Sequence, residues 1–109
     1  MPWYHYAAAF FAGAFLANTV PHFVHGVSGD PFPTPFAKPP GRGLSSPTVN
    51  VLWGLFNLVC GYATWLYGRI SARNPAALLA FFAGVALLSI SMSISFQKKQ
   101  TPSPNARQL

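Results

Sequence analysis

Two histidines and three asparagines are the residues of this chain whose types and spacing could support chemistry. Asn18, His22 and His25 follow one another in steps of four and three, so a continuous helix places them on one face. Asn50 and Asn57 are seven residues apart and share a helical face in the same way. Polar groups beside a broken membrane helix often line binding sites. The five residues therefore predict one polar ligand-binding patch.

A metal ion or a haem is an alternative use of the same histidines. His22 and His25 could share a metal ion with Asp30, whereas bis-histidine haem would need a histidine from a second copy of the chain. The position of His22 argues against both a metal ion and a haem. It lies about 30 Å along its helix, at an interface where histidine commonly bonds headgroups or water. Asn50 and Asn57 could likewise serve only to join helices. The sequence requires no cofactor, and haem or a metal ion stays an open alternative.

The chain has few residues that could catalyse a reaction. Asp30 is the one acidic residue in the chain, so paired carboxylates for acid–base catalysis are absent. The serines have no nucleophile motif, and Gly41-Arg42-Gly43 is too short for a phosphate-binding loop. We expect a protein that is not an enzyme and assign no catalytic residue.

The elements that must position the polar patch are long apolar segments. Of the 109 residues, 51% are hydrophobic and only 7% are charged, against about a quarter charged in soluble domains. Three apolar runs, at about 3–23, 48–67 and 75–96, contain no Asp, Glu, Lys or Arg, and each is near the roughly 20 residues that span a bilayer. The sequence predicts an all-α integral membrane protein with three transmembrane helices in one domain, residues 1–97, surrounded by lipid.

Prolines mark the ends of these helices. Pro21 removes a backbone donor, so the first helix is expected to kink or end there. Ser46-Pro47 and Asn74-Pro75 each read as an N-cap followed by the first helical residue. The connection between the second and third spans is so short that these two spans are expected to form an antiparallel hairpin.

Residues 26–47 form a long connection with six prolines and four glycines, which exclude regular helix or strand over most of it. Phe32 and Phe36 interrupt it, so we expect an ordered loop that caps one end of the bundle, with both rings in protein or at the interface. A mobile loop is the alternative. Residues 98–109 are expected to be a disordered polar tail.

Small residues predict how the helices pack. A stripe at alternating steps of four and three runs along the second span, and a second ridge runs along the first span. The stripe consists of Asn50, Gly54, Asn57, Gly61, Thr64 and Gly68, and the ridge of Ala9, Gly13 and Ala17. Small residues let membrane helices approach closely. Because the two surfaces exceed what one small bundle needs, they predict a homo-oligomer or an accessory subunit of a larger membrane complex.

These observations favour a small structural or interaction membrane protein. An oligomeric transporter or channel built on the polar patch is the first alternative, and a haem- or metal-binding protein is the second. The net charge of +6 flanks the apolar runs, so topology explains it and no nucleic-acid partner is expected. Five basic residues beside the first loop and tail, against two on the other side, predict a bacterial inner-membrane protein with its N-terminus outside and its C-terminus cytoplasmic.

Overall fold

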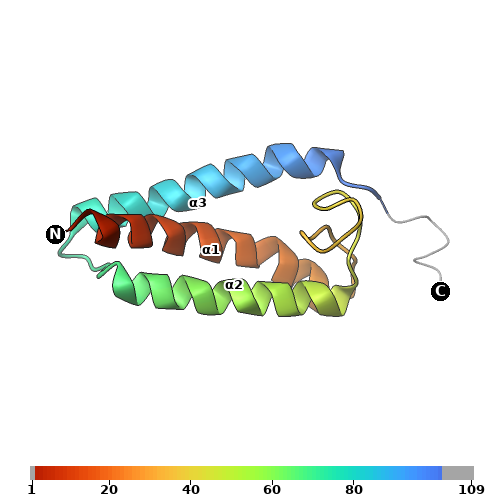
Figure 1. Cartoon of the computed structure of the whole chain (residues 1–109), viewed down its shortest axis with the longest axis horizontal. Helices are drawn as coiled ribbons and strands as arrows, with labels where there is room; N and C mark the ends of the chain where they lie inside the picture. The colour runs from red at the N-terminus through yellow and green to blue at the C-terminus, as the bar shows by residue number, and fades with distance from the viewer. Residues whose placement is uncertain (1, 102–109) are drawn as a thin grey trace.

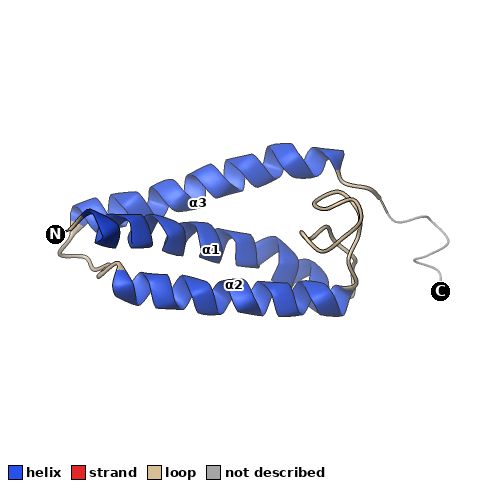
Figure 2. Ribbon diagram, in the orientation of Figure 1, coloured by secondary structure: helices blue, strands red, loops and turns tan. Residues whose placement is uncertain are grey.

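The computed structural model describes residues 2–101 and consists of three long helices joined by loops (Figures 1 and 2). Helix α1 spans Trp3–Val27, α2 spans Pro47–Tyr67 and α3 spans Pro75–Ser95, followed by a short 3₁₀ turn, η1, at Phe96–Lys98. Within the described range there is no strand. All three helices are long and apolar enough to cross a membrane, which confirms the predicted helical class and number of candidate spans.

The second and third helices begin where the sequence predicts. The Ser46 hydroxyl accepts a hydrogen bond from the Val49 N–H at 3.2 Å, and the Asn74 side chain accepts one from the Ala77 N–H at 3.2 Å. A proline occupies the first helical position in both cases. Each cap satisfies one of the backbone donors that a helix start leaves unpaired, so both predicted starts are confirmed.

The first helix is longer than predicted. It does not end near Pro21 but continues through it to Val27, beyond the predicted boundary at residue 23. Proline removes one backbone hydrogen bond, and packing of the last turns on α2 offsets that loss. A Cβ built on Gly26 would lie 2.6–2.8 Å from atoms of Val51 and Pro47, so the two backbones are in close contact there. Figure 1 shows these last turns bending toward the start of α2.

Helix α1 lies between the other two, which corrects the expected pairing of the second and third spans. It packs against both α2 and α3, whereas no Cα of α2 comes within 8 Å of a Cα of α3. At the end away from the loop, the Trp65 ring reaches across to Phe81, with ring centroids 5.1 Å apart. The two helices are antiparallel neighbours in sequence, but the small residues that allow close approach match them to α1 rather than to each other.

The stripe of α2 packs against α1 of the same chain. A Cβ at Gly54, Gly61 or Gly68 would lie 2.7–3.1 Å from the nearest atom of α1. Asn50 and Asn57 are buried on the same face, and Thr64 is partly buried, with its hydroxyl bonded to the Cys60 carbonyl at 2.7 Å. The stripe is therefore occupied within one chain and is not a free surface for assembly.

The ridge of α1 packs against both neighbouring helices, α2 and α3. Ala9 is fully buried and faces Gly68 of α2, whereas Gly13 faces α3. Ala17 is partly buried. Across the α1–α3 contact, a Cβ on Gly13 would lie 2.0 Å from the carbonyl oxygen of Phe81. Backbone meets backbone at this point, so glycine is required there.

Residues 28–46 connect α1 to α2 and fold back toward the bundle rather than away from it (Figure 1). Phe32 and Ser45 exchange two backbone hydrogen bonds, at 3.2 and 3.0 Å, which close the loop at its base. The Gln100 N–H donates to the Arg42 carbonyl at 2.8 Å, so the chain beyond α3 also holds the loop. Phe32 is buried, whereas Phe36 is 65% exposed. The tail residues 102–109 lie outside the described part of the chain.

Candidate functional site

Asn50 is the residue that ties the loop to the helices. Its side-chain nitrogen lies 2.9 Å from the Phe32 carbonyl oxygen, 3.2 Å from that of Ser45 and 3.0 Å from that of Ser46. Its side-chain oxygen lies 2.8 Å from Nδ1 of His22 on α1. Both side chains are almost completely buried. One amide therefore joins α1, the start of α2 and both ends of the loop.

The same contacts determine which ring nitrogen of His22 holds the proton. Carbonyl oxygens only accept hydrogen bonds, so the Asn50 atom that faces three of them is the NH₂ group, and its Oδ1 faces His22. That oxygen can only accept, so Nδ1 of His22 donates. In the neutral ring, Nε2 is then a hydrogen-bond acceptor.

A second amide pair lies one to two turns deeper. Asn18 donates from its side-chain nitrogen to Asn57 Oδ1 at 3.1 Å, and Asn57 donates to the Trp53 carbonyl at 2.8 Å. The direction of the second bond assigns Oδ1 of Asn57 as the acceptor of the first. The remaining oxygen of Asn18 is left as an acceptor. Two pairs, His22–Asn50 and Asn18–Asn57, thus join α1 to α2.

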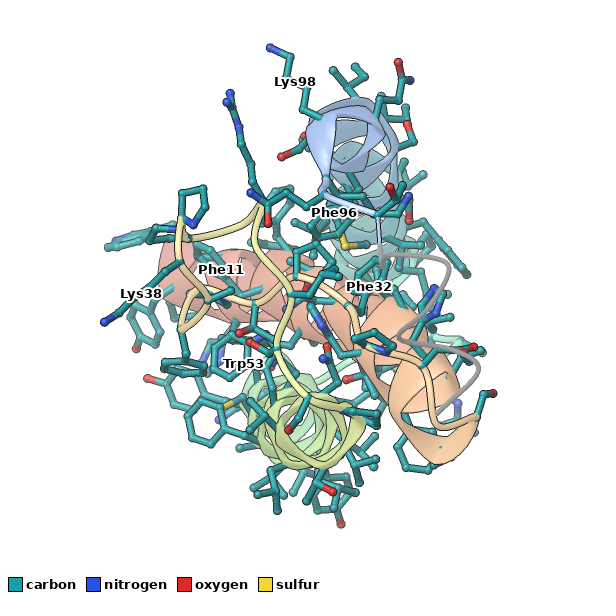
Figure 3. The ribbon with its side chains drawn as sticks, turned by 90° about the vertical axis from the view of Figure 1, so that its right-hand side faces the viewer. Phe11, Phe32, Lys38, Trp53, Phe96 and Lys98 are labelled. Atoms are coloured by element: carbon teal, nitrogen blue, oxygen red, sulfur yellow. The ribbon has the colours of Figure 1, made fainter. Side chains whose placement is uncertain are left out.

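Aromatic rings surround His22. Its ring centroid lies 5.5 Å from that of Phe32, 6.3 Å from that of Phe96 and 6.4 Å from that of Trp53, all in edge-to-face arrangements. Phe32 and Phe96 are themselves 4.8 Å apart. In Figure 3, which views the loop end, Trp53, Phe32 and Phe96 lie in that order between the ends of α2 and α3. The rings come from the loop, α2 and η1, and together they fix the imidazole.

A cavity of about 330 Å³ opens beside this cluster. Its walls come from α1, α2, the loop and η1. It is lined by Asn18, His22, Pro33, Thr34, Pro35, Pro40, Gly41, Trp53 and Phe96. A second cavity, of about 280 Å³, shares Asn18 and Trp53 with the first and continues along α1 past Ala14, Phe15 and Leu88. Asn18 and Trp53 therefore line both spaces.

Trp53 lines both cavities and carries an unpaired hydrogen-bond donor. Its indole Nε1 is buried and, within residues 2–101, has no hydrogen-bond partner. An unmade hydrogen bond at a buried donor costs about 1–3 kcal/mol, so such an atom is a candidate for contact with a ligand. Among the described residues, neither Nε2 of His22 nor Oδ1 of Asn18 has a hydrogen-bond partner, and both residues line the first cavity.

The structure brings four of the five predicted patch residues together as two hydrogen-bonded pairs. Asn18 and His22 line the cavity under the loop, whereas Asn50 and Asn57 hold these two residues in place. His25 does not line the cavity. Its ring stacks on Phe32, with centroids 4.3 Å apart and an interplanar angle of 13°.

The metal alternative finds no matching cluster. Among residues 2–101, no group of three or more His, Cys, Asp or Glu side chains is placed to hold an ion. His22 is held by Asn50, and His25 is held against Phe32. The described contact of Asp30 is through its backbone N–H, which donates to the His25 carbonyl at 2.9 Å.

Trp53 and Phe96 are the site residues that the sequence analysis missed. Trp53 lies three residues after Asn50 and four before Asn57, so helical spacing alone would have placed it on the polar face. Phe96 gave no such signal, because its position depends on where the loop folds. Comparison with protein-family models, curated protein sequences and solved structures finds no match for this chain, so the functional argument rests on the geometry.

Proposed function

We propose that this chain is an integral membrane protein that binds a small molecule from the bilayer at its loop end. Membrane insertion is supported by three helices of sufficient length and hydropathy. Large apolar side chains point outward along them, including Leu52, Val59 and Leu79, which are 62–72% exposed. Apolar surfaces of this extent are rare on soluble monomers and suit a lipid environment.

The proposed orientation places the loop end in the cytoplasm of a bacterium, with the start of α1 outside the inner membrane. Basic residues concentrate at the loop end, and fewer lie at the other end. The loop-end residues are Lys38, Arg42, Lys98 and Lys99, and those at the other end are Arg69 and Arg73. Cytoplasmic ends of membrane proteins are enriched in such residues.

The observation that supports binding is the buried, unpaired indole N–H of Trp53 beside a mostly apolar cavity. Small-molecule sites are typically concave and apolar, with volumes of about 300–1,000 Å³ and a few convergent polar groups. Here the polar groups are Trp53, His22 and Asn18. Asn50 and Asn57 hold these groups through hydrogen bonds, so the site is formed before any ligand arrives.

Native mass spectrometry of the protein, extracted gently from its own membrane, tests this proposal. We expect an added mass of one small molecule, and we expect Trp53→Ala to lose it because a wall of both cavities and the unpaired indole donor are removed. Trp65→Ala is the matched control, since Trp65 packs on Phe81 at the other end of α2. An adduct that both variants keep, or none in the wild type, would count against the site.

Association with a partner helix is a second proposed function, as a homo-oligomer or an accessory subunit. It is favoured by four exposed serines near the end of α3, with Ser89 and Ser93 on one helical face and Ser91 and Ser95 on another. Ser93 bonds the Ile90 carbonyl at 2.7 Å, whereas the described residues give the other three hydroxyls no partner. Hydroxyls on membrane helices commonly bond across helix–helix contacts, so the face of α3 with Ser91 and Ser95, rather than the stripe of α2, is the proposed partner surface.

Cysteine cross-linking in native membranes tests the second proposal. In a Cys60→Ala background, Ser91→Cys is expected to form a cross-linked species under mild oxidation. Leu52→Cys, on the outer face of α2, should give much less. A band at twice the chain mass would indicate self-association, and a heavier band would indicate a different subunit. Equal yields at the two positions would contradict a specific contact through α3.

A further inference from the structure

The hydrogen-bonding groups of the cavity and its shape define the chemistry of its ligand, on the basis of the proposed binding function. We propose that the ligand is a neutral amphiphile with a ring-borne hydroxyl, a phenol or quinol, and an apolar tail. The head occupies the cavity under the loop, and the tail follows the second cavity along α1. The argument has four parts: polarity, shape, continuity and depth.

Polarity selects a hydroxyl group. Trp53 Nε1 only donates a hydrogen bond, whereas the free positions on His22 and Asn18 accept. One hydroxyl can satisfy both kinds of group, because it donates one hydrogen bond and accepts others. A ketone or an ether accepts from Trp53 but leaves the two acceptors unmatched. No Asp, Glu, Lys or Arg lines the cavity, so a charged headgroup has no counter-charge there.

Shape selects a ring. Trp53 and Phe96 present aromatic surfaces to the cavity, and three proline rings complete its wall on the loop side. Aromatic rings pack well in offset or edge-to-face contact with other rings. The Trp53 ring is itself supported on its far side by Phe36 and Phe56, with centroids 5.1 and 5.7 Å away. A flat head fits between such walls better than a branched or bulky one.

Continuity and depth select a tail. The second cavity begins at Asn18 and Trp53 and is bordered by Ala14, Phe15 and Leu88, which offer an apolar path between α2 and α3. Asn18 is fifteen residues after Trp3, about 22 Å along the helix axis. The cavity thus runs from the loop end toward the middle of the proposed bilayer. An amphiphile in that leaflet has the same orientation, with its polar head outward and its tail inward.

Three matched probes test the proposal: 4-hexylphenol, 4-hexylanisole and hexylbenzene. The protein is reconstituted in phosphatidylcholine nanodiscs, and its tryptophan indole N–H signals are followed by NMR. Signals of Trp3, Trp53 and Trp65 are assigned with single Trp→Phe variants. Concentrations are expressed as mole fractions in the membrane, because the probes partition differently. The wild-type comparison uses no variant in the site, so it does not depend on a variant that folds.

We expect 4-hexylphenol to shift the Trp53 signal saturably, with the Trp3 and Trp65 signals unmoved. The anisole keeps the acceptor but loses the donor, so its affinity should fall roughly tenfold, and hexylbenzene should bind still more weakly. Equal affinities for all three probes would overturn the hydroxyl assignment while leaving the binding site standing. No selective shift of Trp53 by any probe would overturn both the assignment and the proposed function.

Asn18→Ala provides an independent check. It removes one acceptor from the lining of both cavities without touching the His22–Asn50 contact. The preference for the phenol over the anisole is expected to shrink severalfold, with each affinity expressed relative to that of hexylbenzene for the same variant. A preference that persists unchanged would show that Asn18 does not read the hydroxyl and would overturn its role.

Discussion

Gly84→Ala is expected to separate α3 from α1 and to lower the stability of the bundle more than any other single methyl addition considered. The added Cβ would lie 1.9 Å from the carbonyl oxygen of Phe10 and 3.1 Å from the Ala14 nitrogen. These are backbone atoms of a packed helix, so they cannot rotate away as a side chain would. Overpacking a core typically costs about 1–3 kcal/mol, and a backbone clash belongs at the upper end. Unfolding in mild detergent, titrated with denaturing detergent, measures the loss.

Two matched variants give this prediction a rank order. Ala83→Leu places a larger side chain on the exposed face of α3 and should change stability by less than about 0.5 kcal/mol. Gly54→Ala should be intermediate, because its nearest neighbour, the Phe23 nitrogen, is 3.1 Å from the added atom. If Gly84→Ala were as stable as Ala83→Leu, the close approach of α1 and α3 would be wrong.

Asn50→Ala is expected to release the loop from the helices. The substitution removes the donor to three carbonyls and the acceptor for His22 in one step. The carbonyls of Phe32, Ser45 and Ser46 each keep a backbone donor, so the main loss is the partner of the buried His22 Nδ1, and we expect stability to fall by about 1–3 kcal/mol. Hydrogen–deuterium exchange should rise sharply at residues 32–45, where the two backbone bonds of the loop base lie.

Asn57→Ala is the control for this loss. It removes the contact with Asn18, and such interhelical bonds average about 0.6 kcal/mol in membranes. It should leave exchange in the loop unchanged. Asn50→Asp, which keeps the shape but removes the donor, should release the loop as Ala does. Equal effects of Asn50→Ala and Asn57→Ala, or a loop that stays protected without Asn50, would contradict the role given to this amide.

Periodicity explains why much of the helical framework was predictable. The spacing of Gly54, Gly61 and Gly68 identifies the face of α2 that packs, and Ser46 and Asn74 identify two helix starts. Periodicity does not indicate which of the other helices packs against that face. A ridge of small residues fits any other ridge, so the hairpin of α2 and α3 was expected where α1 in fact intervenes.

The polar patch was predictable in part for the same reason. Asn18 with Asn57, and His22 with Asn50, are pairs at matching depths on two faces that meet. The loop has no period, so nothing in the sequence indicates that the carbonyls of Phe32 and Ser45 turn toward Asn50. Likewise, Phe96 joins the site only because the loop folds under the end of α3. Pro21 allowed either a kink or an early end of the first helix, and α1 continues past it to Val27 because its last turns pack on α2.

The central position of α1 has a consequence for how the chain is made. Of the three helices, α1 is synthesised first and packs between the other two, so its two packing faces are covered only after α2 and α3 have been made. A nascent chain that stops after α2 has Gly13 uncovered and lacks Leu88 and Phe96, which complete the two cavities. The proposed ligand site is therefore complete only once α3 and Phe96 have been made.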